Sequence, residues 1–119
     1  MCGIAGFIDF NNSSSRDVLV QCTDVLIHRG PDGGGYEFFQ QQGHQVGLGH
    51  RRLSIIDLSA AASQPMWYKH YCIVFNGEMY NYESVKKELE ELGHAFNTHS
   101  DTEVILHAWE QWGTGMIAR

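Results

Sequence analysis

The stretch MCGIAGFIDF (residues 1–10) decides how the rest of the chain is interpreted. Its largely apolar part, residues 2–10, predicts a buried strand that ends at the turn-forming NNSSS of residues 11–15. The same stretch places Cys2 directly behind the start methionine. Cys2 is therefore either an ordinary small apolar residue or a nucleophile set at a chain end, and the remaining residues decide between these roles.

Three amphipathic stretches predict helices. From about Ser15, apolar residues recur at spacings of three and four, which places them on one helical face. These residues are Val18, Leu19, Cys22, Val25 and Leu26. Two further stretches, residues 82–93 and 100–113, also carry apolar residues on one helical face, and each ends in a glycine. In the last stretch, Ser100 and Glu103 have the spacing of a capping box.

The middle of the chain is dominated by predicted strands. Residues 36–40 and 45–57, separated by a polar QQGH, predict an antiparallel pair. Residues 57–66 predict a loop, and residues 71–75 a further strand. The Asn-Gly pair at residues 76–77 then indicates a type I′ hairpin turn. Strands and helices in this order, without regular alternation, favour an α+β layered domain over a doubly wound sheet.

The composition is that of a single globular domain. The chain has 119 residues, 43% of them hydrophobic and 18% charged, and a formal net charge of -6. The acidic balance argues against nucleic acid or an anionic membrane as a partner. No apolar run is long enough to span a membrane and no leader is recognisable, so a cytoplasmic location is expected. An odd count of three cysteines does not fit a disulfide framework, and Cys22 and Cys72 are expected in the core.

Several common kinds of site are not supported by the sequence. The chain has seven histidines but no H-E-x-x-H, and the spacing of His94 and His99 fits no usual ligand pair, so no metal is expected. The glycine-rich residues 31–36 lack the lysine of a phosphate-binding loop. A G-x-S-x-G nucleophile elbow is also absent from the sequence.

The remaining candidates are polar groups at the ends of predicted strands and in loops. Each has an ordinary structural interpretation when it is taken alone. The Asn-Gly pair is a turn, Asp101 is an acidic residue in the first turn of a helix, and the two arginines at positions 51 and 52 are surface charges or ion-pair members. Cys2 taken alone is a buried strand residue.

Taken together, five stretches resemble the glutaminase domain of asparagine synthetase-like class II glutamine amidotransferases. They are MCGIAGF (1–7), HRGPD (28–32), RLSIIDL (52–58), FNGEMYNY (75–82) and SDTEVIL (100–106). The stretches occur in the order and with spacings comparable to those of that family, and the resemblance extends over essentially the whole chain. It implies the α/β/β/α layered fold of N-terminal nucleophile hydrolases.

The resemblance implies that Cys2 is a nucleophile that carries its own base. Removal of Met1 would leave one residue with both a thiol and a free α-amine. Their reference pKa values are about 8.5 and about 7.7–8.0, so the amine can accept the thiol proton near neutrality. The thiolate would attack the side-chain amide of glutamine and form a γ-glutamyl thioester, releasing ammonia.

The resemblance also assigns the groups that would hold glutamine. It places the oxyanion donors on the Asn76 side chain and the Gly77 backbone N–H. Arg52, and not its neighbour at position 51, would bind the α-carboxylate, while Asp101, assisted by Glu78, would bind the α-ammonium.

Domain limits and partners are further expectations from the resemblance. The family's domain continues beyond residue 119, so residues 1–119 are expected to form a partial glutaminase domain, incomplete in its sheets, without a synthetase domain. No cofactor is expected in this chain; ATP and magnesium would belong to the absent synthetase domain. The expected partners are L-glutamine and that downstream domain, and a homodimer is left open. The alternatives are a non-catalytic fragment that only binds glutamine or a partner domain, and a purely structural α+β domain.

Overall fold

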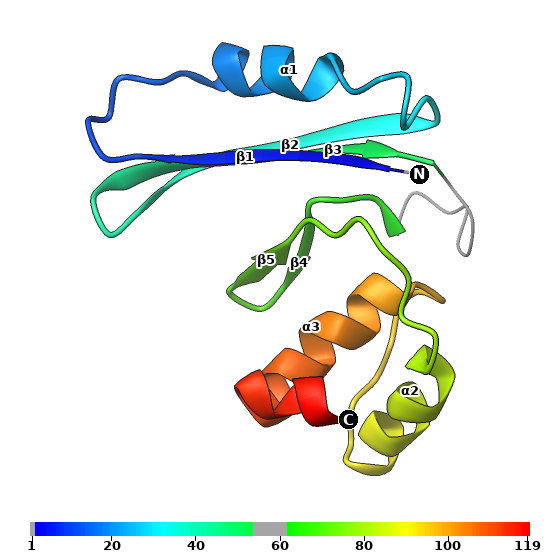
Figure 1. The fold of residues 1–119 in the computed structure, drawn as a ribbon. Helices are drawn as coiled ribbons and strands as arrows, with labels where there is room; N and C mark the ends of the chain where they lie inside the picture. Colours follow the sequence, from blue (N-terminus) through cyan, green and yellow to red (C-terminus); the bar gives the residue numbers. More distant parts are fainter. Residues whose placement is uncertain (1, 54–61) are drawn as a thin grey trace.

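A three-stranded antiparallel sheet forms the N-terminal half of the computed structural model, which describes residues 2–53 and 62–119. Its strands are β1 (Gly3–Asp9), β2 (Gly33–Gln41) and β3 (His44–Arg52), in the order β1-β3-β2 (Figure 1). The strand predicted at residues 2–10 is present, but the expectation that it is buried is wrong: β1 is an edge strand, and Ile4 and Ile8 are 46% and 58% exposed. The predicted antiparallel pair is confirmed, except that residues 54–57 lie outside the described residues.

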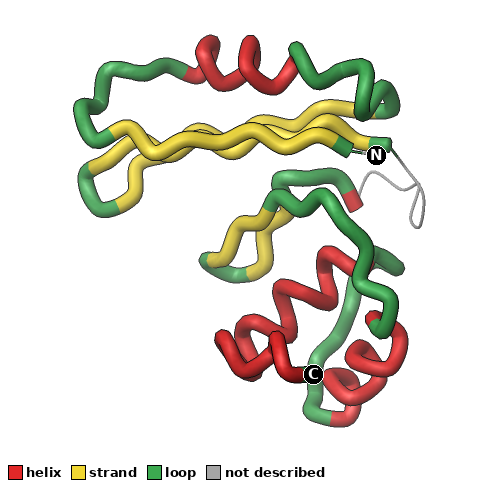
Figure 2. The backbone as a smooth tube through the Cα atoms, in the orientation of Figure 1, coloured by secondary structure: helices red, strands yellow, loops and turns green. Residues whose placement is uncertain are grey.

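The turn between β2 and β3 consists of two residues. Gln41 pairs with His44, and the intervening Gln42 and Gly43 have φ angles of 52° and 80°. Positive φ at both central residues defines a type I′ turn, whose twist matches that of the flanking strands. Figure 2 shows this turn at one end of the sheet.

Helix α1 (Arg16–Asp24) covers one face of this sheet through Leu19 and Thr23, both of which have no exposed surface. The helix approaches the sheet closely, because a Cβ added to Gly49 would lie 1.9 Å from Oγ1 of Thr23. The expected apolar face is therefore wrong in part, since Val18, Cys22 and Val25 are exposed. Apolar residues spaced by three and four positions are compatible with either of two adjacent faces of the helix. The face that contains Thr23 is buried, because Gly49 leaves room on the sheet for the Thr23 side chain.

A second, two-stranded sheet lies on the face of the three-stranded sheet that is opposite to α1 (Figure 1). It is the hairpin of β4 (Met66–Tyr68) and β5 (Tyr71–Ile73). The strand predicted at residues 71–75 is thus present but shorter. Of the loop predicted at residues 57–66, residues 57–61 lie outside the described residues, and Met66 begins β4. The rings of Phe39 and Trp67, with centroids 5.6 Å apart, join the two sheets.

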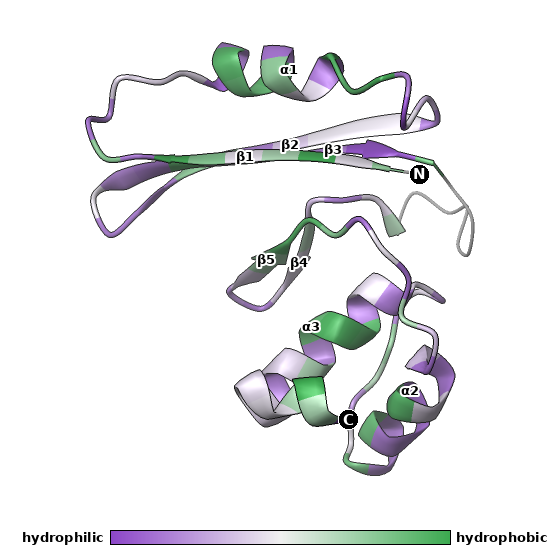
Figure 3. Ribbon diagram, in the orientation of Figure 1, coloured by the Kyte–Doolittle hydropathy of each residue, from purple (hydrophilic) through white to green (hydrophobic). Residues whose placement is uncertain are grey.

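Two α-helices follow the β4–β5 hairpin and confirm the helices predicted at residues 82–93 and 100–113. They are α2 (Tyr82–Glu91) and α3 (Asp101–Trp112), and the 3-10 helix η2 (Gly113–Ala118) follows them. Val85, Leu89, Val104 and Ala108 form the buried cluster between the two helices. Figure 3 shows apolar and polar residues alternating along both of them.

The fold is α+β, as expected from the sequence. In Figure 1 the chain stacks α1, the three-stranded sheet, the β4–β5 hairpin and then α3 with α2. Among the described residues, no helix combines the length and apolar character needed to cross a membrane.

Candidate functional site

A hollow that is open to solvent lies between the three-stranded sheet, the loop after β5 and the start of α3. Residues from distant parts of the chain line it. They include Cys2, Arg52, Gln64, Gly77, Glu78 and Asp101. The structure therefore brings together five of the six residues that the resemblance assigned to catalysis or binding.

Cys2 reaches the hollow from the start of the edge strand β1. Its half-buried Sγ accepts a hydrogen bond from the backbone N–H of Leu53 at 3.2 Å. Because β1 and β3 are antiparallel and Gly3 pairs with Arg51, the beginning of one strand and the end of the other meet at the same place. The sheet thus fixes the thiol beside the residue that follows the arginine pair.

The two arginines lie on opposite faces of β3, because successive strand residues alternate. Arg51 points toward α1, where its Nε donates to the carbonyl oxygen of Gly30 at 3.0 Å and its Nη1 lies 3.7 Å from Asp24. Arg52 lines the hollow, and its Nη1 donates to Oγ of Ser63 at 3.3 Å. The alternation explains why Arg52, and not Arg51, is the candidate for binding a carboxylate.

Asp101, the first residue of α3, is a nearly buried carboxylate on the wall of the hollow. Only 6% of its surface is exposed, and its Oδ2 accepts a hydrogen bond from the N–H of Met79 at 3.0 Å. Among the described residues, Asp101 has no ion pair in the structure. A cation in the hollow would therefore meet a carboxylate that is held in place and largely removed from water.

The loop that carries Asn76 and Gly77 is not a hairpin turn, so that prediction is wrong. Strand β5 ends at Ile73, the chain continues to α2, and neither Asn76 nor Gly77 has a positive φ. Gly77 lines the hollow together with Phe75, whereas Asn76 between them is exposed and lies outside the lining. A type I′ turn requires a strand that returns beside the first, and here the chain leaves the sheet.

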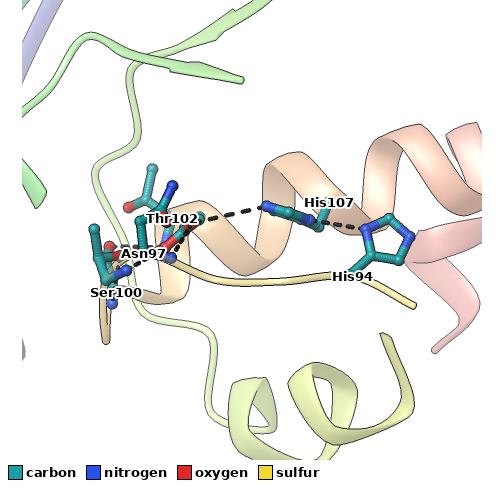
Figure 4. Close-up of polar contacts among 7 residues, drawn as sticks. His94, Asn97, Ser100, Thr102 and His107 are labelled. Atoms are coloured by element: carbon teal, nitrogen blue, oxygen red, sulfur yellow. Dashed lines mark hydrogen bonds and ion pairs between the residues drawn. The ribbon is translucent and has the colours of Figure 1, made fainter. Parts of the chain in front are cut away.

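The turn before Asp101 is held by Ser100 and Glu103, but not as a capping box. The Ser100 side chain accepts from the N–H of Thr102 at 3.1 Å, which confirms it as the N-cap. Glu103 instead accepts from the N–H groups of Asn97 and Thr98, both at 2.8 Å (Figure 4). The reciprocal bond predicted for Glu103 is thus wrong, and its buried carboxylate fixes the loop that leads to Asp101.

A buried histidine on α3, His107, continues this network toward His94 (Figure 4). His107 has 2% of its surface exposed, its Nε2 lies 3.8 Å from Glu103, and its Nδ1 lies 2.8 Å from Nδ1 of His94. Burial is the main cause that lowers the pKa of His107. Sequence reasoning missed this pair, because the two histidines are thirteen positions apart and fit no motif.

His50 is a second buried histidine, and it lines the hollow. It is 1% exposed, and neither ring nitrogen has a hydrogen-bond partner among the described residues. Desolvation lowers its pKa. Within the described part of the chain, no group of three or more histidine, cysteine, aspartate or glutamate side chains is placed to hold a metal ion.

We expect the protein to lose stability between pH 7.5 and pH 5.5. The folded state lowers the pKa of His50 and of His107, so the unfolded chain binds protons first as the pH falls through about 6.5. The contribution of these two neutral histidines to the free energy of unfolding is fully present above that pH and is lost as the pH falls below it. Each kcal/mol lost lowers the Tm by about 4–8 °C in a domain of this size.

Thermal unfolding of three proteins checks this expectation. The drop in Tm from pH 7.5 to pH 5.5 should be smaller for His107→Gln than for the unaltered chain. His28→Gln, which changes an exposed histidine, should show the unaltered drop. An equal drop in all three proteins would show that His107 does not contribute.

A thiol, a guanidinium and a nearly buried carboxylate thus line one hollow, and comparison with known proteins gives the class of the chain. The glutamine amidotransferase domain model matches residues 1–119, so this chain belongs to that family. The chain is 41% identical over 118 residues to each of two glutamine-hydrolyzing asparagine synthetases of Bacillus subtilis, numbers 3 and 1. These matches cover 94% of this chain and 18% of each relative.

A third relative has the same description. It is a putative glutamine-hydrolyzing asparagine synthetase of Methanocaldococcus jannaschii, 35% identical over 129 residues, with 95% of this chain and 24% of that protein covered. The chain therefore spans about a fifth of the length of these relatives. The resemblance drawn from the five sequence stretches is confirmed at the level of the family.

Proposed function

We propose that this chain hydrolyses the side-chain amide of glutamine through Cys2 and supplies the ammonia to an ATP-dependent amidation of the asparagine synthetase type. One observation carries the proposal. Cys2, Arg52 and Asp101, which lie far apart in the sequence, line a single hollow that is open to solvent. Membership of the glutamine amidotransferase family supports glutamine as the substrate.

Recognition of glutamine follows from the charges in the hollow. The Arg52 guanidinium would form a two-pronged contact with the α-carboxylate. Asp101, with Glu78 on the same hollow, would pair with the α-ammonium. Binding at both ends leaves the side-chain amide as the part that reaches Cys2.

The chemistry begins with removal of Met1, which gives Cys2 a free α-amine. This amine accepts the thiol proton, the thiolate attacks the amide carbon, and the carbonyl oxygen becomes an oxyanion. The Gly77 N–H and the Asn76 side chain would stabilise that charge. The protonated amine then returns its proton to the leaving nitrogen as the C–N bond breaks, releasing ammonia. Water hydrolyses the resulting thioester to glutamate and restores the thiol.

Asn76 has to turn toward the hollow for this role, since its side chain is exposed in the structure. Catalytic hydrogen bonds often tighten only when substrate binds. The exposure of Asn76 also favours one alternative, namely a module that binds glutamine without hydrolysing it. The two functions differ in whether a bond to Cys2 forms.

The wider architecture is part of the same proposal. The stacked order of helix, sheet, hairpin and helices would correspond to the α/β/β/α layers of N-terminal nucleophile hydrolases. Residues 1–119 would be a partial glutaminase domain, and a downstream synthetase domain would hold ATP and magnesium and receive the ammonia. The acceptor would be recognised in that domain.

Intact mass before and after exposure to a diazoketone analogue of glutamine tests the proposed function. We expect loss of Met1 and a single adduct, mapped to Cys2 by peptide analysis and suppressed by excess glutamine. A preparation engineered to retain Met1 should form no such adduct, because its free amine is then on the wrong residue. Glutamine binding without an adduct would favour the binding module, and glutamine turnover by protein that retains Met1 would contradict the proposed base.

A further inference from the structure

Gln64 makes side-chain contacts with two separate parts of the candidate site. Its Oε1 accepts a hydrogen bond from the N–H of Phe75 at 2.5 Å, and its Nε2 donates to Oγ1 of Thr102 at 3.1 Å. Both hydrogen bonds are partly buried, and Thr102 is only 2% exposed. One primary amide thus uses its acceptor oxygen for the loop at Phe75 and its donor nitrogen for helix α3.

The two partners are the immediate neighbours of proposed substrate-binding groups. Phe75 directly precedes Asn76, which is assigned to the oxyanion, and Thr102 directly follows Asp101, which is assigned to the α-ammonium. The oxyanion and the α-ammonium lie at opposite ends of a bound glutamine. Gln64 therefore spans the site along the length of its proposed substrate.

The backbone of Gln64 is itself held against the three-stranded sheet. A Cβ added to Gly35 of β2 would lie 1.9 Å from the Gln64 carbonyl oxygen, so the loop and the strand are in direct backbone contact. The amide therefore extends from a fixed position. It connects the sheet that carries Cys2 with the loop at Phe75 and with helix α3.

A second bond links the same loop and helix, but it uses a group that the substrate would engage. This is the bond from the N–H of Met79 to Oδ2 of Asp101 at 3.0 Å. When Asp101 pairs with an α-ammonium, part of its hydrogen-bonding capacity is diverted to the ligand. The Gln64 side chain carries no charge to pair with the α-ammonium, and its two hydrogen bonds both go to the protein, so it can hold the spacing whether or not the site is filled.

We propose that Gln64 is a positioning residue that sets the distance between the oxyanion-binding loop and the start of α3, and thereby places the amide of glutamine against Cys2. The inference rests on the proposed function and adds a residue to it. Gln64 does not touch the reacting atoms in this assignment. Its loss should impair reactions that need both ends of glutamine held, and should spare the intrinsic reactivity of the thiol.

Two electrophiles separate these effects. The diazoketone analogue of glutamine needs the whole site, whereas iodoacetamide needs only an accessible thiolate. For Gln64→Ala, the second-order rate of Cys2 labelling by the analogue should fall by about 10- to 100-fold, the size expected from small misplacement of a reacting group. The rate with iodoacetamide, followed on the Cys2 peptide, should change by less than about two-fold.

Thr102→Val is the companion variant, because it keeps the volume of the side chain and removes only the acceptor for Nε2. It should reduce analogue labelling by less than Gln64→Ala does. In the double variant the second change should add little, since the shared bond is already gone. Gln21→Ala, an exposed position on α1, is the matched control and should label like the unaltered chain. If Gln64→Ala is unfolded at the assay temperature, Thr102→Val carries the test.

The outcomes distinguish the two proposals. If the unaltered chain shows no glutamine-protected labelling at Cys2, the proposed function fails and this inference fails with it. If the unaltered chain is labelled selectively and folded Gln64→Ala or Thr102→Val retains the full analogue rate, only the positioning role is overturned. An equal loss with both electrophiles would also overturn it, because that result indicates damage to the thiol itself.

Discussion

Replacing Cys2 with alanine should reduce glutamate release from glutamine to the rate of the uncatalysed reaction. Among the described residues that line the hollow, Cys2 is the one that carries a thiol, and in the proposed chemistry the thioester cannot form without Sγ. The change removes one heavy atom, Sγ, from a half-buried site, and with it two weak hydrogen bonds, one from the Leu53 N–H and one to the Leu53 carbonyl oxygen, so stability should fall by only about 1 kcal/mol. Glutamate release and thermal unfolding of the same preparations give both quantities.

Two further cysteines serve as matched controls for this result. Cys22 is exposed on α1, and burial raises the pKa of the Cys72 thiol to about 11, which keeps it protonated near neutrality. Cys22→Ala and Cys72→Ala should therefore retain glutaminase activity in folded protein. Activity that survives in Cys2→Ala, or disappears equally in Cys22→Ala, would disprove the role of Cys2.

Asp101→Asn should raise the KM for glutamine by at least about 30-fold. The carboxylate is 6% exposed, and loss of one partner from a buried charge pair costs about 2–5 kcal/mol. Asparagine has the same shape, and its side-chain oxygen can still accept from the N–H of Met79. The fold should thus be retained, and steady-state kinetics with a parallel Tm measurement separate binding from stability.

Asp17→Asn is the control, because Asp17 is also an acidic residue in the first turn of a helix but is exposed on α1. Any loss of interaction with the helix dipole is common to both variants. We expect an unchanged KM in Asp17→Asn. If the KM for glutamine in Asp101→Asn matches that of the control, the α-ammonium is bound elsewhere.

The regular elements of this chain could be predicted because they follow hydrophobic periodicity. β1, the β2–β3 pair, α2 and α3 all show such a pattern. β4 has only three residues and could not be recognised by a two-residue alternation. The buried side of α1 depends on the close approach of Gly49 to Thr23, which is a tertiary contact and leaves no trace in the local pattern.

The sequence predicted a set of candidate site residues but not their arrangement in space. The family resemblance selected Cys2, Arg52 and Asp101, and the structure places them around one hollow. Predictions from local sequence patterns were wrong at two places where tertiary contacts determine the structure. The Asn-Gly pair has no returning strand to complete a hairpin, and Glu103 finds better-placed donors at residues 97–98 than the one that a capping box offers.

The two-residue turn at Gln42 and Gly43 offers a place for laboratory modification. The pairing of β3 with both neighbours puts this turn at the opposite end of the sheet from Cys2, roughly 25 Å away at about 3.3 Å per residue. Tags or fluorophores are usually fused to a terminus, and an N-terminal fusion here would cap the amine on which the proposed chemistry depends. A dye attached at this turn would leave that amine uncovered and allow immobilised or single-molecule assays of the intact site.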